Sequence, residues 1–381
     1  MSRSYSSQFL ASRSRLCTLL KSEPLLMFGC GLTFPSFRRV VLFQNRPNVL
    51  DDPGMEDVLD QFVAGHLARV LLRLPLFHGD PMTPNVNLCQ LIDRFGNDEK
   101  CRKALETLRW PDGPKCLRCN GDATPVKDRD TFDCDSCHYQ FTVTTATIFH
   151  DTHLDLWRWF LCTYLLCESR KGMSANQLKR TLGVSYKTAW YLCHRIRKAM
   201  EEADHKLKGT VEIDEMYIGG HTTHADKWKK HQPVIGIRER EGHLHFISAT
   251  NLNQDKINEI IARNVDKTVD VIMTDESKLY NFTTTAFHNA KHKRVNHSKD
   301  EYVRYEGGLT VTTNAIESAF SLFKRGVVGA WHKVSVKHLP AYLNEMTWRF
   351  NNRKNQYLFR DTLIQMLQSD NLEYKELTKA A

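Results

Sequence analysis

The residues TVEIDEMYIGG (210–220) and VDVIMTDES (269–277) decide the fold that we expect for this chain. The first predicts a β-strand that carries Asp214, and the second predicts a strand that ends at Asp275. The apolar run from Val269 to Met273 is typical of a strand buried on both faces of a parallel sheet. Because ligands of open α/β sheets lie beyond the carboxyl ends of the strands, Asp275 is expected at a ligand-binding edge.

A helical pattern, TNAIESAFSLFKRG (313–326), supplies a third acidic residue. At helical spacing one face of this helix is polar, with Asn314, Glu317, Ser321 and Lys324. Mg²⁺ prefers carboxylate and phosphate oxygens, and two such ions about 4 Å apart can drive an in-line displacement at a phosphate. Asp214, Asp275 and Glu317 therefore predict a divalent-metal site for cutting and joining nucleic-acid backbones. Since the chain has 44 acidic residues, caps and turns at strand ends are the alternative interpretation.

The residues around these motifs predict a ribonuclease-H-like α/β domain over 208–360, with a mixed five-stranded sheet and helices. Strands are predicted at 210–218, 233–238 and 243–250, in the segment that ends at Asp275, and at 293–296. Helices are predicted at 254–264, near 279–287 and around Glu317, with a hairpin turn at Glu241–Gly242 and an irregular stretch at 298–309. In this order of elements the first-strand Asp, the fourth-strand Asp and the late-helix Glu converge.

Two Cys-x-x-Cys pairs lie upstream of this domain, separated by 14 residues. They are formed by Cys116, Cys119, Cys134 and Cys137. Each pair can point two thiolates at one ion, so the four residues predict a tetrahedral site for one structural Zn²⁺ in a zinc ribbon at 113–150. The alternative is a redox or disulfide pair of pairs, but the odd total of eleven cysteines favours a reducing compartment. Whether the ribbon also clamps DNA is left open.

The segment RKGMSANQLKRTLGVSYKTAWYLCHRIRKAM (170–200) predicts a helix-turn-helix in a DNA-binding region at 151–205. Ser174 and Ser185 are expected to cap the two helices, and Gly183 to supply the turn. The segment has eight Lys or Arg residues and no Asp or Glu. The residues expected to contact duplex DNA are Lys187, Arg195, Arg197 and Lys198. An ordinary basic helical hairpin is the alternative.

The remaining segments give weaker predictions. Residues 1–81 are an atypical extension, interpreted as a start codon assigned too far upstream of Met82 or as an Arg- and Ser-rich transit peptide. Residues 82–112 predict two short amphipathic helices broken at Gly96, and 361–381 predict an amphipathic helix with a frayed tail. Trp331 either stacks on a DNA end or packs in the core.

Charge and hydropathy limit the class of partner. The net charge of +9 and the isoelectric point near 8.9 indicate a polyanionic partner. The longest apolar run, WFLCTYLLC (159–167), is too short to cross a bilayer, so no membrane partner is expected. A second zinc site is conceivable, but solvated or DNA-facing histidines are the preferred interpretation of His221, His224, His231, His288, His292 and His297.

With these motifs in this order, the chain resembles the bacterial insertion-sequence transposases that join an N-terminal zinc ribbon to a DDE domain, a group related to the eukaryotic Merlin elements. The resemblance covers about 82–360, and further motifs that carry it are WPDGPKCLRC, CDSCHYQF, LGVSYKTAWYLCHRIRKAM, WHKVSVKHL and RFNNR. It implies a catalytic triad of Asp214, Asp275 and Glu317 that holds two Mg²⁺ or Mn²⁺ ions. It also implies that Asp214 is chosen over Glu212 and Glu215, and that Lys324 is an auxiliary catalytic residue near the DNA.

The resemblance further implies binding to terminal inverted repeats in double-stranded DNA, cleavage at the element's ends and joining of the freed 3′-hydroxyl to target DNA. A homo-oligomer on DNA, in a bacterial cytoplasm and associated with the nucleoid, is expected, with Asn314 and Trp331 at the DNA. Related proteins commonly have His-Thr-Asn where this chain has Thr312-Thr313-Asn314. An inactive transposase-derived DNA-binding protein and a ribonuclease-H-like nuclease are the alternatives.

Overall fold

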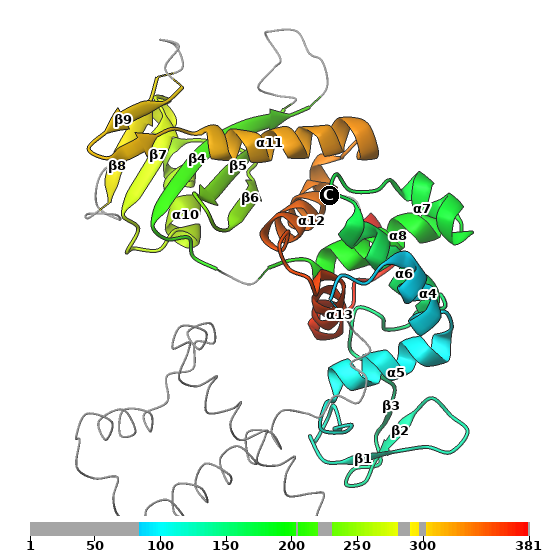
Figure 1. Cartoon of the computed structure of the whole chain (residues 1–381). Coiled ribbons are helices and arrows are strands. Elements are labelled where there is room, and N and C mark those ends of the chain that lie inside the picture. Colours follow the sequence, from blue (N-terminus) through cyan, green and yellow to red (C-terminus); the bar gives the residue numbers. More distant parts are fainter. Residues whose placement is uncertain (1–83, 203–204, 220–230, 281–289, 297–301, 380–381) are drawn as a thin grey trace, which may run out of the picture. The chain divides into compact units, whose positions relative to one another are not determined.

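The computed structural model describes residues 84–202, 205–219, 231–280, 290–296 and 302–379 (Figure 1). The chain separates into two compact units, Met1–Gly79 and Asp80–Ala381, and the described residues belong to the second. The extension predicted at 1–81 lies outside the described residues, as does most of the helix predicted near 279–287. Within the described ranges, no helix is long and apolar enough to cross a membrane.

Two short helices open the described chain, α4 (Leu88–Phe95) and α5 (Asp98–Arg109), and Gly96 ends the first of them as predicted. The start of α4 is fixed by a reciprocal pair of hydrogen bonds. Asn87 accepts the backbone N–H of Gln90, and Gln90 accepts the backbone N–H of Asn87. Such a capping box satisfies two donors that the first turn of a helix otherwise leaves without partners.

Three more helices follow the cysteine motifs, namely α6 (Leu156–Glu168), α7 (Ala175–Leu182) and α8 (Tyr186–Ala199). Ser174 and Ser185 cap α7 and α8 as predicted, since each side chain accepts a backbone N–H of the first turn. Gly183 between the two helices has φ +66°, a left-handed conformation that glycine adopts without steric cost. The structure thus confirms both helices and the turn, while their role in DNA binding stays a prediction.

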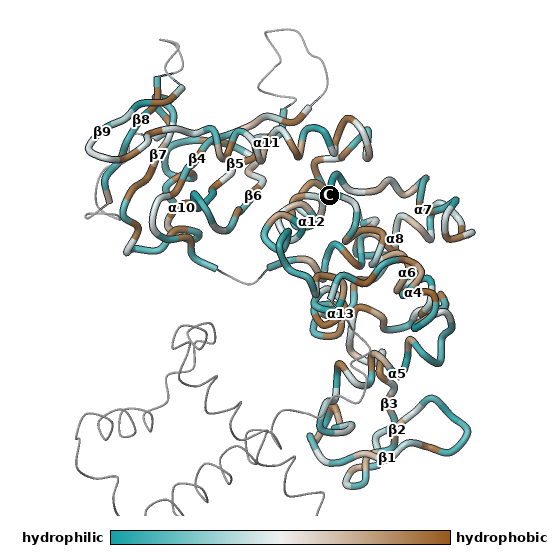
Figure 2. Tube along the Cα trace, in the orientation of Figure 1, coloured by the Kyte–Doolittle hydropathy of each residue, from teal (hydrophilic) through white to brown (hydrophobic). Residues whose placement is uncertain are grey.

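These helices share one hydrophobic core, to which α13 (Leu358–Gln368) contributes. Phe95, Phe160 and Phe359 pack against one another with ring centroids 5.3–6.3 Å apart. Figure 2 shows α6 as a largely hydrophobic segment, in keeping with its place in this core. The amphipathic helix predicted within 361–381 is confirmed, since α13 buries side chains such as Leu363. The predicted frayed tail is wrong in part, because it contains a further short helix, α14 (Tyr374–Thr378).

The second region is a mixed sheet with the strand order β6-β5-β4-β7-β8. Its strands are β4 (Thr210–Ile218), β5 (Gln232–Glu239), β6 (Leu244–Ser248), β7 (Val271–Asp275) and β8 (Lys291–Val295). Neighbouring strands among β4, β5 and β6 run antiparallel, whereas β7 is parallel to both β4 and β8. The five predicted strands and their mixed sheet are confirmed, with small shifts at the strand ends.

The alternation of side chains along β4 decides which of them face which helix. Three helices accompany the sheet, namely α10 (Gln254–Asn264), α11 (Asn314–Gly326) and α12 (Leu339–Asn351). Val211 and Ile213 pack with α10, whereas Met216 packs with α11 and α12. Figure 1 shows α11 crossing the sheet over β4 and β5. Because successive strand residues point to opposite faces, Glu212 and Asp214 lie on the face that α11 covers.

The stretch predicted as irregular, 298–309, contains part of a hairpin. It is formed by β9 (Arg304–Glu306) and β10 (Leu309–Val311), which pair antiparallel. Gly307 and Gly308 connect them with φ values of +59° and +78°, and a Gly-Gly pair suits such a two-residue hairpin turn. The prediction overlooked this turn signal because the flanking strands, three residues each, are too short to show an alternating pattern.

A buried ion cluster joins α8 of the helical region to α12, which packs on the sheet. The Nε of Arg197 donates to Oε2 of Glu345 at 2.6 Å, and Nη2 of Arg349 lies 3.1 Å from Oε1 of the same carboxylate. The Arg197 guanidinium also lies 4.0 Å from the ring centre of Tyr342. Because the side chains of Arg197 and Glu345 are only 2% and 0% exposed, each charge depends on the other for compensation.

The imidazole of His194 is enclosed beside this cluster. Its ring lies 4.5 Å from that of Trp190, 4.9 Å from that of His338 and 5.6 Å from that of Tyr342. Neither ring nitrogen has a hydrogen-bond partner in the described structure. Burial, and then the charges of Arg197 and His338, lower the pKa of His194 to about 2. The imidazole therefore stays neutral wherever the protein is folded near neutral pH.

We predict that His194→Leu makes the free energy of unfolding less dependent on pH. Between the pKa of about 2 in the folded protein and about 6.5 in the unfolded chain, only the unfolded state binds this proton. The wild type therefore loses stability as pH falls toward and below about 6.5, by about 1.4 kcal/mol between pH 7.5 and 5.5. Urea unfolding at pH 7.5 and 5.5 measures this loss. His153→Leu, at an exposed position, is the control and should keep the wild-type pH dependence.

Candidate functional site

The predicted carboxylates meet at the carboxyl end of β7, where β4 runs parallel to it. The register of the two strands pairs Glu212 with Met273, so Asp214 and Asp275 lie at equivalent positions on neighbouring strands. Carboxylate oxygens of Asp214, Glu215 and Asp275 all lie within 4.8 Å of one another. Glu317, on α11, lines the same cleft as Asp214. The structure therefore brings the three predicted carboxylates together and adds Glu215.

The electrostatics of this cleft favour a bound cation. Burial raises the pKa of Asp214 to about 7, and the charges of Glu215, Asp275 and Glu317 add to this effect. A hydrogen bond of 2.8 Å from the backbone N–H of Glu215 opposes it. Carboxylates held this close repel one another unless a proton or a cation lies among them. The oxygen-only donor set fits a hard divalent cation such as Mg²⁺.

Glu215 is a member of the cleft that the sequence did not single out. The hydroxyl of Tyr280 donates to Oε2 of Glu215, which holds that carboxylate toward the cluster. Burial and the charge of Asp275 raise the pKa of Glu215 above its ordinary value. Strand alternation places neighbouring residues on opposite faces, so the position next to Asp214 gave no reason to expect it in the same cluster. The pairing of β4 with β7 stops at Glu212, so Glu215 lies on a part of β4 that no longer pairs with that strand.

Glu212, the remaining carboxylate on this strand, is fully buried and acts on α11. Its Oε2 accepts the backbone N–H groups of Ala315 and Ile316 at 2.9 and 3.1 Å. The residue at the N-cap position, Thr313, makes no capping bond with its own side chain, so Glu212 satisfies these donors instead. A negative charge at this end also suits the helix dipole. Arg240 lies 3.2 Å from the second oxygen of Glu212.

This cap fixes where α11 begins and hence where Glu317, one turn farther on, is presented to the cleft. The hydroxyl of Thr313 donates to Oε1 of Glu317 at 3.1 Å, which further restrains that carboxylate. Arg240 also donates to the carbonyl oxygen of Thr310 at 2.7 Å, so it ties the chain before α11 to the same anchor. Glu212 is therefore engaged in positioning the helix.

We predict that Glu212→Gln destabilises the protein by about 3 kcal/mol, because removing one partner of a buried ion pair leaves the other uncompensated. This value is at the lower end of the usual loss of stability for a broken buried ion pair, because the side chain of Arg240 is 28% exposed. Urea unfolding measures the change. Glu259→Gln, in an exposed pair with Lys256, should change stability by less than about 0.5 kcal/mol. Equal losses in the two variants would show that the cap contributes nothing.

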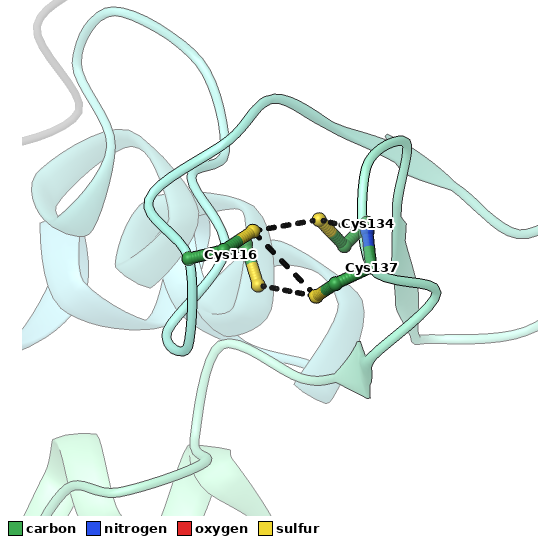
Figure 3. A group of neighbouring side chains, drawn as sticks. Cys116, Cys134 and Cys137 are labelled. Carbon is green, nitrogen blue, oxygen red and sulfur yellow. Dashed lines mark hydrogen bonds between the residues drawn. The ribbon is translucent and has the colours of Figure 1, made fainter.

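The four predicted cysteines form a second cluster, in a small three-stranded sheet of β1 (Ala123–Pro125), β2 (Phe132–Cys134) and β3 (Gln140–Phe141). Their Sγ atoms lie 3.6 Å apart for Cys116 and Cys137, 3.4 Å for Cys119 and Cys134, and 3.5 Å for Cys119 and Cys137. A tetrahedral zinc ion with Zn–S bonds of about 2.3 Å requires ligand separations of about 3.8 Å. Figure 3 shows Cys116, Cys134 and Cys137 pointing toward one another.

The surroundings of the cysteines also fit a structural zinc site. Backbone N–H groups of Arg118 and Cys137 point at Sγ of Cys116 and Cys134, both at 3.4 Å, as suits thiolates. The apolar core beside them is small, with Trp110 packed edge-on against Phe132 and Phe141. Because so few side chains cannot hold a segment of this length folded, the ion is expected to supply stability.

We predict one zinc ion per chain, released when the cysteines are blocked with a mercurial and counted with a chromophoric chelator. Cys134→Ser, at a fully buried ligand position, should lose the ion and the near-ultraviolet dichroism of Trp110. Cys89→Ser is the matched control, since Cys89 is exposed and outside the cluster. Full zinc content in Cys134→Ser would contradict the Cys₄ assignment.

The residues predicted to contact DNA divide into exposed and buried ones. The exposed ones are Lys187, Lys198, Asn314 and Lys324. Arg195 is 4% exposed and donates to the carbonyl oxygen of His150 and to Asn371 at 2.6 and 2.7 Å. Arg197 belongs to the buried ion cluster, and Trp331, 8% exposed, packs on Phe323. Arg195, Arg197 and Trp331 therefore face the interior in this structure, and Trp331 shows the core packing given as its alternative.

Of the six histidines considered for a second zinc site, His221, His224, His288 and His297 lie outside the described residues. His292 lies 2.9 Å from the hydroxyl of Thr274, and burial and then Arg294 lower its pKa to about 4. Across the described ranges, the groups that could hold a metal are the Cys₄ cluster and the carboxylate cluster, and neither contains a histidine.

Known proteins share these domains. The family model of an ISXO2-like transposase domain matches residues 206–351, and that of a transposase zinc-ribbon domain matches residues 96–140. An "Uncharacterized protein in transposable element ISH50" from Halobacterium salinarum is 26% identical, over 68% of this chain and 92% of its own length.

A solved Drosophila P element transposase strand transfer complex aligns with 60% of this chain and 63% of its own chain at 13% identity. This chain thus spans less than two thirds of that one, and the TM-score of 0.23 is too low to support an argument about fold. The domain matches are the informative result. The chain carries the zinc-ribbon and DDE domains of insertion-sequence transposases, which confirms the resemblance predicted from its motifs.

Proposed function

We propose that this protein is a DDE-type DNA transposase that cuts DNA at the ends of its element and joins them to target DNA, with a catalytic domain of the ribonuclease-H-like fold. The observation that supports this most strongly is that Asp214 lies beside Asp275 and lines one cleft with Glu317, within a segment that matches a transposase domain. The order and pairing of the five strands are those expected for the ribonuclease-H-like fold. Structural Zn²⁺ in the ribbon and divalent cations in the cleft are the proposed cofactors.

The cleft residues are proposed to have different roles in phosphoryl transfer. Two Mg²⁺ or Mn²⁺ ions, when bound, would activate the attacking oxygen and stabilise the leaving one. Asp214 and Asp275 hold the negative charge that attracts such ions, and Glu317 approaches from α11 across the cleft. Ser321 and Lys324 line the same cleft on the polar face of α11. Lys324 is exposed there and is placed to neutralise a DNA phosphate.

The two capped helices α7 and α8 are proposed as the helix-turn-helix that binds the terminal inverted repeats in double-stranded DNA. The first residues of α8, Tyr186 and Lys187, are exposed, and a recognition helix contacts base edges with its N-terminal residues. The later part of α8 packs against α12, so it is not free to enter a groove. Bringing two element ends together calls for a homo-oligomer on DNA, which we expect to act at the nucleoid of a bacterial cytoplasm.

The second candidate function is that of an inactive, transposase-derived DNA-binding protein. A ribonuclease-H-like nuclease is a further alternative. The first is favoured by the sequence before α11, where Thr312 takes the position at which related proteins commonly have histidine. Thr312 has a structural role in this chain, since its hydroxyl accepts the backbone N–H of Asn314 at 3.1 Å. The intact cluster of carboxylates favours an active enzyme over this alternative.

We predict metal-dependent nicking at the element's ends by the purified full chain. The substrate is an end-labelled duplex that carries the terminal repeat flanking this coding sequence, with Mg²⁺ or Mn²⁺ added. Glu317→Gln should reduce cleavage at least about 100-fold, because even an outer partner of a metal ligand contributes about 10–100-fold. Glu241→Gln, an exposed substitution in the β5–β6 turn, makes the same chemical change away from the cleft and should cleave normally.

The outcomes separate the three functions. Cleavage at the repeat end followed by joining to a second duplex establishes the transposase. Tight binding to the repeat without cleavage in any metal would instead establish the inactive DNA-binding protein. Cleavage that ignores the repeat and prefers an RNA–DNA hybrid would establish the nuclease.

A further inference from the structure

A second cleft adjoins the carboxylate cleft. It lies between the start of α7 and η4 (Val327–Trp331), the π-helical turn that continues α11. Arg325 and Val328 line both clefts, so the two clefts adjoin at these side chains. π-Helical turns are rare and are frequently found at functional sites. The second cleft therefore lies between the first cleft and the start of α7 in the helical region.

The second cleft is lined by cations and by no carboxylate. Its charged and titratable lining residues are Lys171, Arg180, Arg325 and His332, with Ser174 and Gln177 as further polar groups. Lys171, Arg180 and Arg325 are exposed, and within the described structure none of the three forms an ion pair. Three cations gathered without acidic neighbours repel one another, so the cleft suits a polyanion.

The walls of this cleft are fixed by close packing between the segments before α7 and after α11. Gly172 lies so close to Trp331 that a Cβ at this position would stand 2.4 Å from the indole ring. At Gly326 a Cβ would stand 2.9 Å from the carbonyl oxygen of Lys171. The hydroxyl of Ser169 donates to the carbonyl oxygen of Gly172 at 2.7 Å and closes the turn. The backbone segments that carry Lys171 and Arg325 are therefore packed closely against each other.

His332 is held at the mouth of the cleft by a strained backbone. Its φ of +59° and ψ of −42° place it at the centre of a three-residue turn, closed by the N–H of Lys333 and the carbonyl oxygen of Trp331 at 2.7 Å. Non-glycine residues adopt this conformation at a cost in free energy, and such strain occurs mostly at ligand-binding sites. Glycine would relieve the strain, so a side chain at this position suggests that the imidazole is used.

We propose that this cation cleft, formed by Lys171, Arg180, Arg325 and His332, grips the phosphodiester backbone of the DNA strand that enters the carboxylate cleft. This inference rests on the proposed function, because it takes DNA as the ligand of the neighbouring site. Since the phosphate to be cut must lie in the neighbouring carboxylate cleft, the contacts proposed here are to phosphates, and such contacts are independent of sequence. It places the strand between the end of α11 and the start of α7, and so aligns the scissile phosphate without reading the repeat.

The test measures how DNA affinity depends on salt. Fluorescence anisotropy of the full chain is recorded on a fluorescein-labelled 30-base-pair duplex carrying the element end, and on a scrambled duplex, across a range of KCl without added Mg²⁺. Each phosphate contact contributes about 0.9 to the slope of log affinity against log salt. Lys171→Gln, Arg180→Gln and Arg325→Gln should each lower that slope by about 1 on both duplexes.

The control is Lys267→Gln, which removes the same charge. Lys267 is exposed and precedes β7, at the edge of the sheet opposite to Asp275. This variant should keep the wild-type slope. A fourth variant, His332→Gly, should weaken binding to both duplexes while its Tm is no lower than that of the wild type. A lower Tm with unchanged affinity would show that His332 serves the turn alone.

The result also separates this proposal from the proposed function. If the wild type binds neither duplex and does not cleave the element end, both the transposase proposal and the proposed role of the cation cleft fail. If the wild type binds and cleaves but the three Gln variants keep the wild-type slope, the cation cleft is overturned and the transposase proposal stands.

Discussion

The ion cluster of Arg197, Glu345 and Arg349 is the interaction on which the arrangement of this protein depends. One carboxylate satisfies two guanidinium groups in a place that water does not reach. Arg349 also donates to the carbonyl oxygen of Ser169, at the turn before α7. The cluster thus links α8, α12 and this turn. Because breaking a buried pair costs far more than an exposed one, the link favours a single arrangement of the two regions.

β4 shows how position on one strand can give three carboxylates three different environments. Glu212 is buried beneath α11 and bonded to backbone N–H groups, so its charge stabilises the helix start. Asp214 lies two residues farther on, partly open to the cleft, where its charge is available to a ligand. Glu215 is held by Tyr280 at the strand edge. The sequence EIDE contains all three, and only their packing partners distinguish them.

Local patterns predicted the local structure well. The serine caps, the glycine turn, the strands around Asp214 and Asp275, and the Cys-x-x-Cys pairs all depend on neighbours in the sequence, and the structure has each of them. Burial of long basic side chains could not be predicted in this way. Arg195 and Arg197 lie on a basic helix, but their partners, Asn371 and Glu345, are more than 140 residues away. Likewise, Glu215 joins the cluster through Tyr280, which no spacing rule places nearby.

The position of α13 has a consequence for the order in which the chain acquires structure. Residues 206–351, with the whole sheet and α11, are complete before α13 leaves the ribosome, and domains generally fold as they emerge. The core of the helical region, by contrast, pairs Phe95 and Phe160 with Phe359. Contacts across so many residues form late because long loops must close first. A newly made chain would therefore hold its carboxylate cleft before α6 and α8 are secured, and α8 further requires Asn371 as the partner of Arg195.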